Sequence, residues 1–346
     1  KKQNMSLKNL NASNKTHNFF IEKLKNKKIF QIYKKFEKNI NLDQDFIVAV
    51  SGGPDSLALS FLAKVYSIKK SLKANYFLVD HRLRKNSSNE AKFVKKLLKK
   101  SSISLSILKW NGKKPKKNIQ SIARVKRYAL LKNQCQTLKI NYILTGHHKD
   151  DLIENFFIRM LRGSGLNGMV SFNEKSKNEN VNVIRPLLKF SKKDLIFISK
   201  KVFETYIEDI SNQNENFKRV KIRNLINTLK SEGLDNKKLN LTIKNLKFAN
   251  DSIDFFINNN ITNNSSIFSN KKTIFLNKEF FNQPEEVVFR SLTEIIKKVG
   301  KKYYPVRGKK IIKIVKLIKN NTLFKITLGN CVIKRVNDTI IVSKEH

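Results

Sequence analysis

A turn of small residues follows the apolar run 47–50 and has the sequence Ser51-Gly52-Gly53-Pro54-Asp55-Ser56. The residues after it have helical spacing, so the pattern predicts a strand, a loop and a helix, which together bind phosphates through backbone N–H groups. The loop lacks the Gly-Lys-Ser/Thr ending that supplies the lysine of a Walker loop. Its acidic residue, Asp55, repels a bare phosphate but can bind Mg²⁺. We therefore interpret these residues as a nucleotide-binding loop rather than as an ordinary turn that enters a helix.

A second reactive segment contains two histidines and three carboxylates: His147, His148, Asp150, Asp151 and Glu154. If a helix begins near His148, the carboxylates converge near its start, and its apolar side chains face the core: Ile153, Phe156, Phe157 and Met160. Hard oxygen ligands suit Mg²⁺, whereas zinc is disfavoured because cysteine ligands are missing and the histidines are adjacent. The alternative is that the carboxylates only complement the helix dipole.

Arginine is scarce in this chain, at 12 of 71 basic residues, so a position that uses it favours a planar, bidentate donor. The predicted helix 122–128 places Arg124 and Arg127 on one side. Another predicted strand ends at Val79-Asp80-His81-Arg82, where a base or a phosphate could be contacted. Arg219 and Arg223 have i,i+4 spacing. For the helix 122–128 and for Arg82 a solvated basic surface is the alternative interpretation.

Composition favours a polyanionic partner. The 346 residues have a formal net charge of +44, from 71 Lys and Arg against 27 Asp and Glu, which favours nucleic acid. A general lysine bias inflates this value, so its sign is more informative than its magnitude. The two cysteines, Cys135 and Cys331, have no metal-binding spacing and indicate a reduced, cytoplasmic protein. No apolar run approaches the roughly 18 residues that a membrane span requires, so we expect no membrane partner.

Strand and helix patterns alternate from residue 46 onward, with strands expected at 47–50, 76–79, 104–108 and 142–144. Such alternation predicts an α/β fold with a doubly wound parallel sheet, whose ligands bind at the carboxyl ends of its strands. Before it we expect a disordered stretch, 1–16, and one amphipathic helix between Phe19 and Phe36. The predicted domains are an N-terminal extension with its helix, a nucleotide-binding catalytic domain and a smaller helical α+β domain: 1–41, 42–225 and 226–346.

The C-terminal domain has a basic segment, 297–319, with ten Lys or Arg and no acid. Its helical pattern places three lysines opposite an apolar face, Lys309, Lys313 and Lys316 against Ile311, Val315 and Ile318. Together with Tyr303 and Tyr304 this face suits an RNA backbone, although a solvated surface is about as plausible for any single lysine. The chain then alternates as short strands at 324–328, 331–335 and 339–342, with turns at Gly329-Asn330 and Asn337-Asp338.

The loop Ser-Gly-Gly-Pro-Asp-Ser after a strand resembles the PP-loop of the ATP pyrophosphatases, which cleave ATP to AMP and pyrophosphate. In the same order the chain carries further motifs that together resemble the tRNA(Ile)-lysidine synthases: V-D-H-R-L-R, H-H-K-D-D-L-I-E-N, R-G-S-G-L, R-P-L-L, E-D-x-S-N and F-x-R-x-x-I-R. The resemblance in sequence is strong over residues 45–225. Beyond them only the layout of the predicted helices and strands is similar. Val220 stands where an Asn is common in this family, but Arg219 and Arg223 are retained.

The resemblance implies that O2 of the wobble cytidine in a CAU anticodon attacks the α-phosphate of ATP, and that free L-lysine then displaces AMP to give lysidine. It implies ATP and Mg²⁺, the metal held by Asp55 and Asp151. The expected catalytic residues are Asp55, Asp150, Asp151, Glu154, Arg219 and Arg223. The expected ATP-binding residues are Ser51, Gly52, Gly53, Pro54, Asp55, Ser56, His81 and His147. The expected tRNA-binding residues are Arg124, Arg127, Arg162, Lys309, Lys313 and Lys316.

Two alternative functions remain open from the sequence. One is another PP-loop enzyme that modifies tRNA, although a thiolase is disfavoured by two distant cysteines. The other is a non-catalytic RNA-binding protein on a nucleotide-binding fold. The sequence leaves the oligomeric state open between monomer and homodimer.

Overall fold

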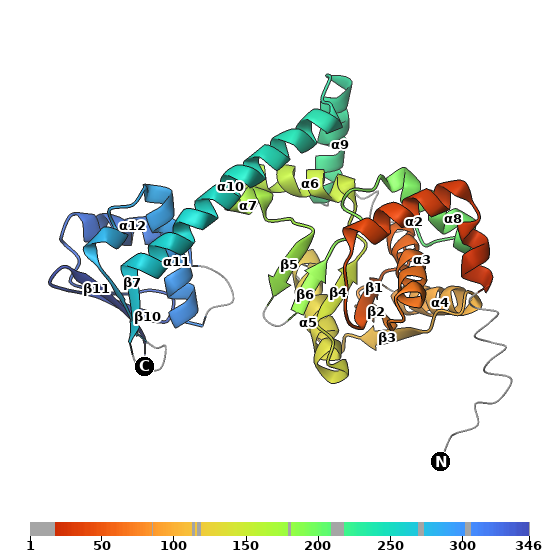
Figure 1. The fold of residues 1–346 in the computed structure, drawn as a ribbon, viewed down its shortest axis with the longest axis horizontal. Helices are drawn as coiled ribbons and strands as arrows, with labels where there is room; N and C mark the ends of the chain where they lie inside the picture. The colour runs from red at the N-terminus through yellow and green to blue at the C-terminus, as the bar shows by residue number, and fades with distance from the viewer. Residues whose placement is uncertain are drawn as a thin grey trace, which may run out of the picture. The chain divides into compact units, whose positions relative to one another are not determined.

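The computed structural model describes residues 18–84, 86–112, 115, 119–178, 181–208, 218–268, 273–301 and 306–345. The chain divides into two compact units, Lys1–Leu239 and Asn240–His346, which are described separately below (Figure 1). The domain boundary predicted at residue 225 lies within α9 (Lys218–Ser231). The expected disordered stretch, 1–16, and Tyr303 and Tyr304 lie outside the described residues.

The N-terminal helix is interrupted, so the prediction of one continuous helix was wrong. Residues 18–24 are helical, and α2 (Lys27–Asn39) begins anew after Asn26. The side chain of Asn26 accepts hydrogen bonds from the backbone N–H groups of Lys28 and Ile29, both at 3.1 Å. Asparagine is a favoured N-cap because it satisfies N–H groups that a helix start leaves unpaired. The apolar face of α2 is nevertheless buried as expected.

The first unit contains the predicted doubly wound sheet. Its strands are β1 (Phe46–Val50), β2 (Ala74–Asp80), β3 (Leu105–Lys109), β4 (Tyr142–Thr145), β5 (Lys175–Asn178) and β6 (Val181–Ile184). They lie in the order β3-β2-β1-β4-β6-β5, and all pairs are parallel except β5 with β6. Val48 of β1 pairs with Tyr76 on one side and Leu144 on the other. The strand order reverses between β1 and β4, so a ligand cleft is expected at the carboxyl ends of these two strands.

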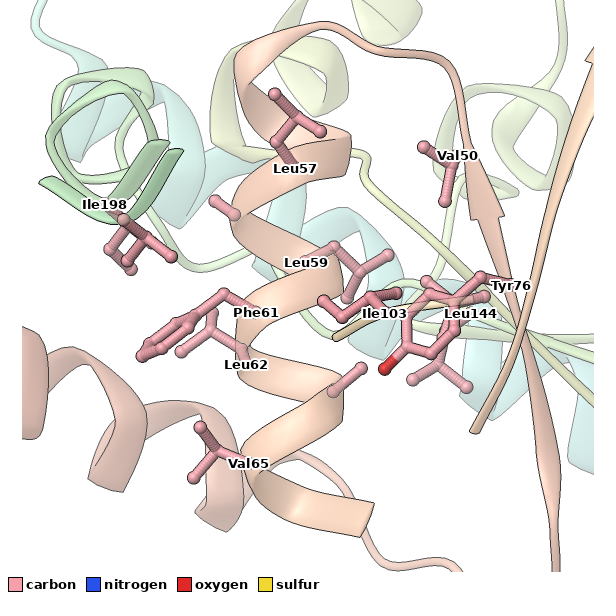
Figure 2. Packing of buried hydrophobic residues seen from close by; sticks show 14 of the residues in the cluster. Val50, Leu57, Leu59, Phe61, Leu62, Val65, Tyr76, Ile103, Leu144 and Ile198 are labelled. Atoms are coloured by element: carbon pink, nitrogen blue, oxygen red, sulfur yellow. The ribbon is translucent and has the colours of Figure 1, made fainter. Parts of the chain in front are cut away.

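Helices cover both faces of this sheet. One layer contains α2, α3 (Pro54–Lys69), α4 (Ser87–Lys100) and α8 (Lys192–Phe203), and α5 (Ile119–Leu138) covers the other face. Figure 2 shows α3 packed on two sides, with Leu59 toward the sheet and Phe61 toward Ile198 of α8. A helix that is apolar all round is stable only when it is buried. Because α3 is fixed on both sides, the loop that begins it is fixed too.

The second unit packs two helices on an antiparallel sheet. After α10 (Asn236–Asn264) come β7 (Ser265–Phe268), β8 (Thr273–Leu276), η2 (Lys278–Phe280), α11 (Glu285–Val299), α12 (Gly308–Lys319), β9 (Lys325–Thr327), β10 (Cys331–Val336) and β11 (Thr339–Lys344). The sheet order is β7-β8-β11-β10-β9. The last three strands were predicted, and β7 and β8 were missed. The turn at Gly329-Asn330 is confirmed, since both residues have positive φ, at 66° and 63°.

The basic helix α12 has the two faces that its pattern predicted. Ile311 and Ile318 are buried and Val315 is half-buried, whereas the three lysines of the opposite face are exposed: Lys309, Lys313 and Lys316. The lysines therefore stand in solvent on a helix that is anchored through its other side.

Candidate active site

The loop after β1 is closed by one serine. Ser56 Oγ accepts hydrogen bonds from the backbone N–H groups of Ser51 and Gly52, at 3.1 and 3.0 Å, and donates to the carbonyl of Gly53 at 3.0 Å. Gly52 has φ +91°, and a Cβ on it would lie 2.6 Å from Val94 Cγ2, so a side chain fits neither the backbone nor the space. The loop is thus held in one shape before any ligand binds. In this state Ser56 organises the loop rather than pointing freely at a phosphate.

Asp55, in the first turn of α3, carries an incompletely satisfied carboxylate. Its Oδ1 is buried and has no hydrogen-bond partner among the described residues. Burial raises the pKa of Asp55, His148 opposes the rise, and the charge of Asp151 adds to it. A buried carboxylate oxygen without a partner is costly unless something binds it.

The second segment brings another carboxylate to the same place. His148 caps α6 (Lys149–Met160) and is only 5% exposed. Its backbone N–H donates to Asp151 Oδ2 at 3.0 Å, and its Nε2 lies 3.7 Å from an oxygen of both Asp55 and Asp151. The expected convergence of Asp55 with Asp151 is therefore present. Asp150 is more exposed and lies on the Nδ1 side of the same ring.

This pair of carboxylates suits Mg²⁺. Within the described ranges, no three acidic, histidine or cysteine side chains converge to hold a metal by themselves. Mg²⁺ does not require such a set, because it commonly takes one or two carboxylates and completes its octahedron with water and substrate phosphates. The unpartnered oxygen of Asp55 next to Asp151 provides that limited donor set. The residues present therefore fit the metal that the sequence led us to expect.

Glu154 has a different partner from the one its spacing suggested. Its buried carboxylate pairs with the guanidinium of Arg223, which comes from α9. Burial lowers the pKa of Arg223, but the hydrogen bond and charge of Glu154 outweigh burial and raise it. This ion pair forms part of the wall of a cavity of about 310 Å³. The other polar residues of that wall are His148, Asp150, Lys192, Asn227 and Lys230.

Six of the twelve arginines form a cationic cluster at the same edge of the sheet: Arg124, Arg127, Arg159, Arg162, Arg185 and Arg219. Among the described residues, none of the six has a carboxylate at ion-pair distance. The guanidiniums of Arg124 and Arg127 lie 5.2 and 5.8 Å from the ring centroid of Tyr128. That of Arg185 lies 4.8 Å from the ring centroid of Phe172. We refer to these six residues as the arginine cluster.

Both predicted ATP-binding histidines lie beside the arginine cluster. Burial, then Arg185 and three further arginines, lower the pKa of His147 well below its usual range. Burial and Arg127 lower the pKa of His81, whose buried Nδ1 has no partner among the described residues. Both rings are therefore neutral at pH 7 and can accept as well as donate hydrogen bonds.

The PP-loop domain family matches residues 22–229 of this chain. A protein of Wolbachia pipientis wMel named tRNA(Ile)-lysidine synthase is 32% identical over 301 residues, which are 86% of this chain and 70% of the relative. A protein of the same name from Orientia tsutsugamushi is 33% identical over 318 residues, 90% of this chain and 71% of the relative. The chain belongs to the tRNA(Ile)-lysidine synthase family. As a lysidine synthase it is an enzyme with an ATP-binding PP-loop domain.

A U34-tRNA thiolase from Methanococcus maripaludis resembles the lysidine synthase in fold, with a TM-score of 0.55 and 15% identity over 64% of this chain and 78% of the thiolase. This likeness concerns the fold alone. In the part of the lysidine synthase that the structure describes, no helix is long and apolar enough to cross a membrane.

Sequence reasoning gave no role to four residues that lie at this candidate site of the lysidine synthase. His148 was named with the other histidine and the carboxylates of its segment but was given no role beyond the start of a helix, and Lys192 was not selected because lysine is abundant throughout the chain. Arg159 and Arg185 were not selected either, although the scarcity of arginine was the signal that could have identified them. Met160 was expected in the core and is 43% exposed, so that prediction was wrong.

Proposed function

We propose that the enzyme makes lysidine in tRNA(Ile) in two chemical steps at the carboxyl edge of β1 and β4. First, O2 of the wobble cytidine of the CAU anticodon attacks the α-phosphate of ATP, which releases pyrophosphate and leaves AMP on the base. The ε-amine of free lysine, after its ammonium form has released a proton to solvent, then bonds to C2, and AMP leaves with the C2–O2 electron pair. The observation that carries this proposal is the unpartnered, buried carboxylate oxygen of Asp55 beside Asp151 on a preformed PP-loop.

In the first step the protein positions charge. The loop around Gly52 and Gly53 presents its backbone to the phosphates, and Asp55 and Asp151 hold Mg²⁺. When bound, the metal neutralises charge that develops on the α-phosphate and on the leaving pyrophosphate. The neutral rings of His81 and His147 contact the nucleotide at the same edge. Preorganised charges of this kind usually supply the largest part of a rate enhancement.

In the second step the cavity beside α6 and α9 binds the substrate lysine. Its wall contains both signs of charge, as recognition of an amino acid requires. We assign the substrate's ammonium group to Asp150 and its carboxylate to Lys192 and Lys230. The ion pair of Glu154 with Arg223 holds α9 against α6 and so keeps the cavity closed on that side.

The arginine cluster binds the RNA next to the target base. Arginine matches a phosphate with two parallel N–H groups, and no carboxylate of the described residues lies at ion-pair distance from these six side chains. Arg185 is buried and donates to the carbonyl of Asn173 and to Ser176 Oγ, so it supports the cluster while the more exposed members reach the phosphates. The neighbouring ring of Tyr128, which is half-buried, offers a surface on which an unstacked base can lie. The exposed lysines of α12 add phosphate contacts from the second unit.

The assay that tests this function incubates the enzyme with ATP, lysine and unmodified tRNA(Ile). We expect AMP and pyrophosphate rather than ADP, and lysidine in the RNA. With lysine omitted, adenylated RNA should accumulate. Another PP-loop tRNA modification would leave lysine unconsumed, and a non-catalytic RNA-binding protein would leave ATP intact.

Glu154→Gln is expected to impair the second step more than the first. The amide cannot balance the charge of Arg223, so α9 loosens from α6 and the lysine cavity opens. We expect KM for lysine to rise about tenfold or more, about 1.4 kcal/mol, while adenylation without lysine changes less than threefold. Rapid-quench measurement of AMP release with and without lysine separates the two steps. Equal loss in both steps would contradict the assignment.

Neutralising the exposed face of α12 is expected to weaken tRNA binding without affecting ATP. If Lys309, Lys313 and Lys316 contact phosphates, changing all three to Gln should flatten the salt dependence of tRNA affinity by roughly one unit per contact. Modification at saturating tRNA should recover most of its rate. Filter binding between 50 and 200 mM salt measures the slope, and an unchanged slope would show that this face is only solvated.

A further inference from the structure

His148 is a buried residue whose ring has two separate tasks. It is the N-cap of α6, where its Nδ1 accepts a hydrogen bond from the backbone N–H of Asp150 at 3.2 Å. An imidazole nitrogen that accepts a hydrogen bond carries no proton, so in the neutral ring the proton lies on Nε2. The cap therefore fixes the tautomer of the ring.

The protonated nitrogen faces the two carboxylates that we assign to Mg²⁺. Nε2 lies 3.7 Å from Oδ2 of Asp55 and 3.7 Å from Oδ2 of Asp151. These distances are beyond hydrogen-bond length but within the range of a direct electrostatic contact. Asp55 belongs to α3 and Asp151 to α6, so a single N–H group stands between acids of two different helices.

We propose that His148 is a positioning residue that orients Asp55 and Asp151 for the metal. The inference rests on the proposed metal site. Because Oδ2 of Asp55 is drawn toward the imidazole, its other oxygen, Oδ1, is left without a partner and available to the ion. The same N–H reduces the repulsion between two carboxylates that must stay close before the metal arrives.

A purely structural role in capping predicts a different outcome, and two substitutions separate the roles. Asn is a strong N-cap, and its amide oxygen takes the place of Nδ1, but its side chain is too short to replace Nε2. Gln has the opposite property, since its longer amide can present an N–H near the position of Nε2 while the cap is lost. His148→Asn therefore tests the positioning role, and His148→Gln tests the cap.

The direct measurement is Mn²⁺ binding, followed by electron paramagnetic resonance, to the full chain with a non-cleavable α,β-methylene analogue of ATP. We expect His148→Asn to weaken Mn²⁺ binding between 10- and 100-fold, as loss of a residue that orients a metal ligand usually does. Its melting temperature should stay close to that of the parent. We expect His148→Gln to bind Mn²⁺ within threefold of the parent and to melt at a lower temperature.

Two further variants make each outcome decisive. Asn26→Ala removes the cap of α2, which lies outside the site, and should lower the melting temperature without changing Mn²⁺ affinity. Asp55→Asn should abolish the bound Mn²⁺ signal. If Asp55→Asn binds Mn²⁺ like the parent, the metal site itself is wrong. If Asp55→Asn loses the metal but His148→Asn retains it within threefold, the metal site stands and the positioning role is refuted.

Discussion

Asp55→Asn is expected to lower the rate of AMP formation about a thousandfold while the protein stays folded. One preorganised charged group at a phosphate is typically worth two to three orders of magnitude in rate, and here the metal is lost with it. Asn has nearly the same volume and keeps the first turn of α3 intact. The loop contacts that close the PP-loop come from Ser56 and not from Asp55.

The same substitution is expected to raise the melting temperature at pH 7 in Mg²⁺-free buffer. Burial raises the pKa of Asp55 above its value in the unfolded chain, so the folded protein binds the proton more tightly. Such a group stabilises the fold most below its unfolded pKa, and this contribution is lost as pH rises through the folded pKa. At pH 7 the ionised carboxylate is therefore a net cost that the neutral amide removes.

The two measurements are single-turnover formation of AMP and thermal unfolding in EDTA between pH 4 and pH 8. As pH falls toward the raised pKa of Asp55, the melting temperature of the parent should rise relative to that of Asp55→Asn. This should be seen before general acid unfolding begins. An activity within tenfold of the parent would remove Asp55 from the mechanism. A lowered melting temperature in EDTA would show that its carboxylate is structural.

The sequence was sufficient for features that depend on local spacing. The buried strand β1, the small-residue turn and the apolar helix α3 are contiguous, so their pattern predicted the PP-loop and the edge of the sheet where it lies. The start of α6 at His148 was equally local. The prediction that Met160 is buried was wrong because the apolar face of α6 continues beyond the core that covers Ile153 and Phe157. Helical periodicity shows which side a residue is on but not where the neighbouring core ends.

Features that depend on distant segments were not predictable from one sequence. Glu154 and Arg223 are 69 positions apart, and no spacing rule connects them. The arginine cluster collects residues from α5, α6 and the turn after it, α9 and the end of β6. Arg124, Arg127, Arg162 and Arg219 were selected from the sequence, but no spacing rule showed that they lie together or that Arg159 and Arg185 join them. The strands β7 and β8 are short and weakly patterned. They are stabilised by pairing, because β8 pairs with the distant β11 and β7 pairs with β8.

The second large expected effect is on tRNA binding and concerns the arginine cluster. We expect the double substitution Arg124→Gln and Arg127→Gln to weaken tRNA binding on the order of a hundredfold, since each lost charge-assisted contact costs about 1.4 kcal/mol. The salt dependence should flatten by about two units. The folded protein should become more stable, because burial and neighbouring arginines already lower the pKa of Arg127, which means that its charge is disfavoured in the fold.

The control for this double variant is Lys126→Gln, which removes a charge from the exposed side of the same helix. It should change tRNA affinity less than threefold and leave the melting temperature unchanged. ATP affinity, measured by calorimetry without RNA, should also change less than threefold in the double variant if the cluster serves the RNA. Loss of ATP binding with unchanged tRNA affinity would instead assign Arg124 and Arg127 to the nucleotide. A lowered melting temperature would mean that the positive charges of the cluster are compensated in the protein without RNA, and that the cluster stabilises the fold.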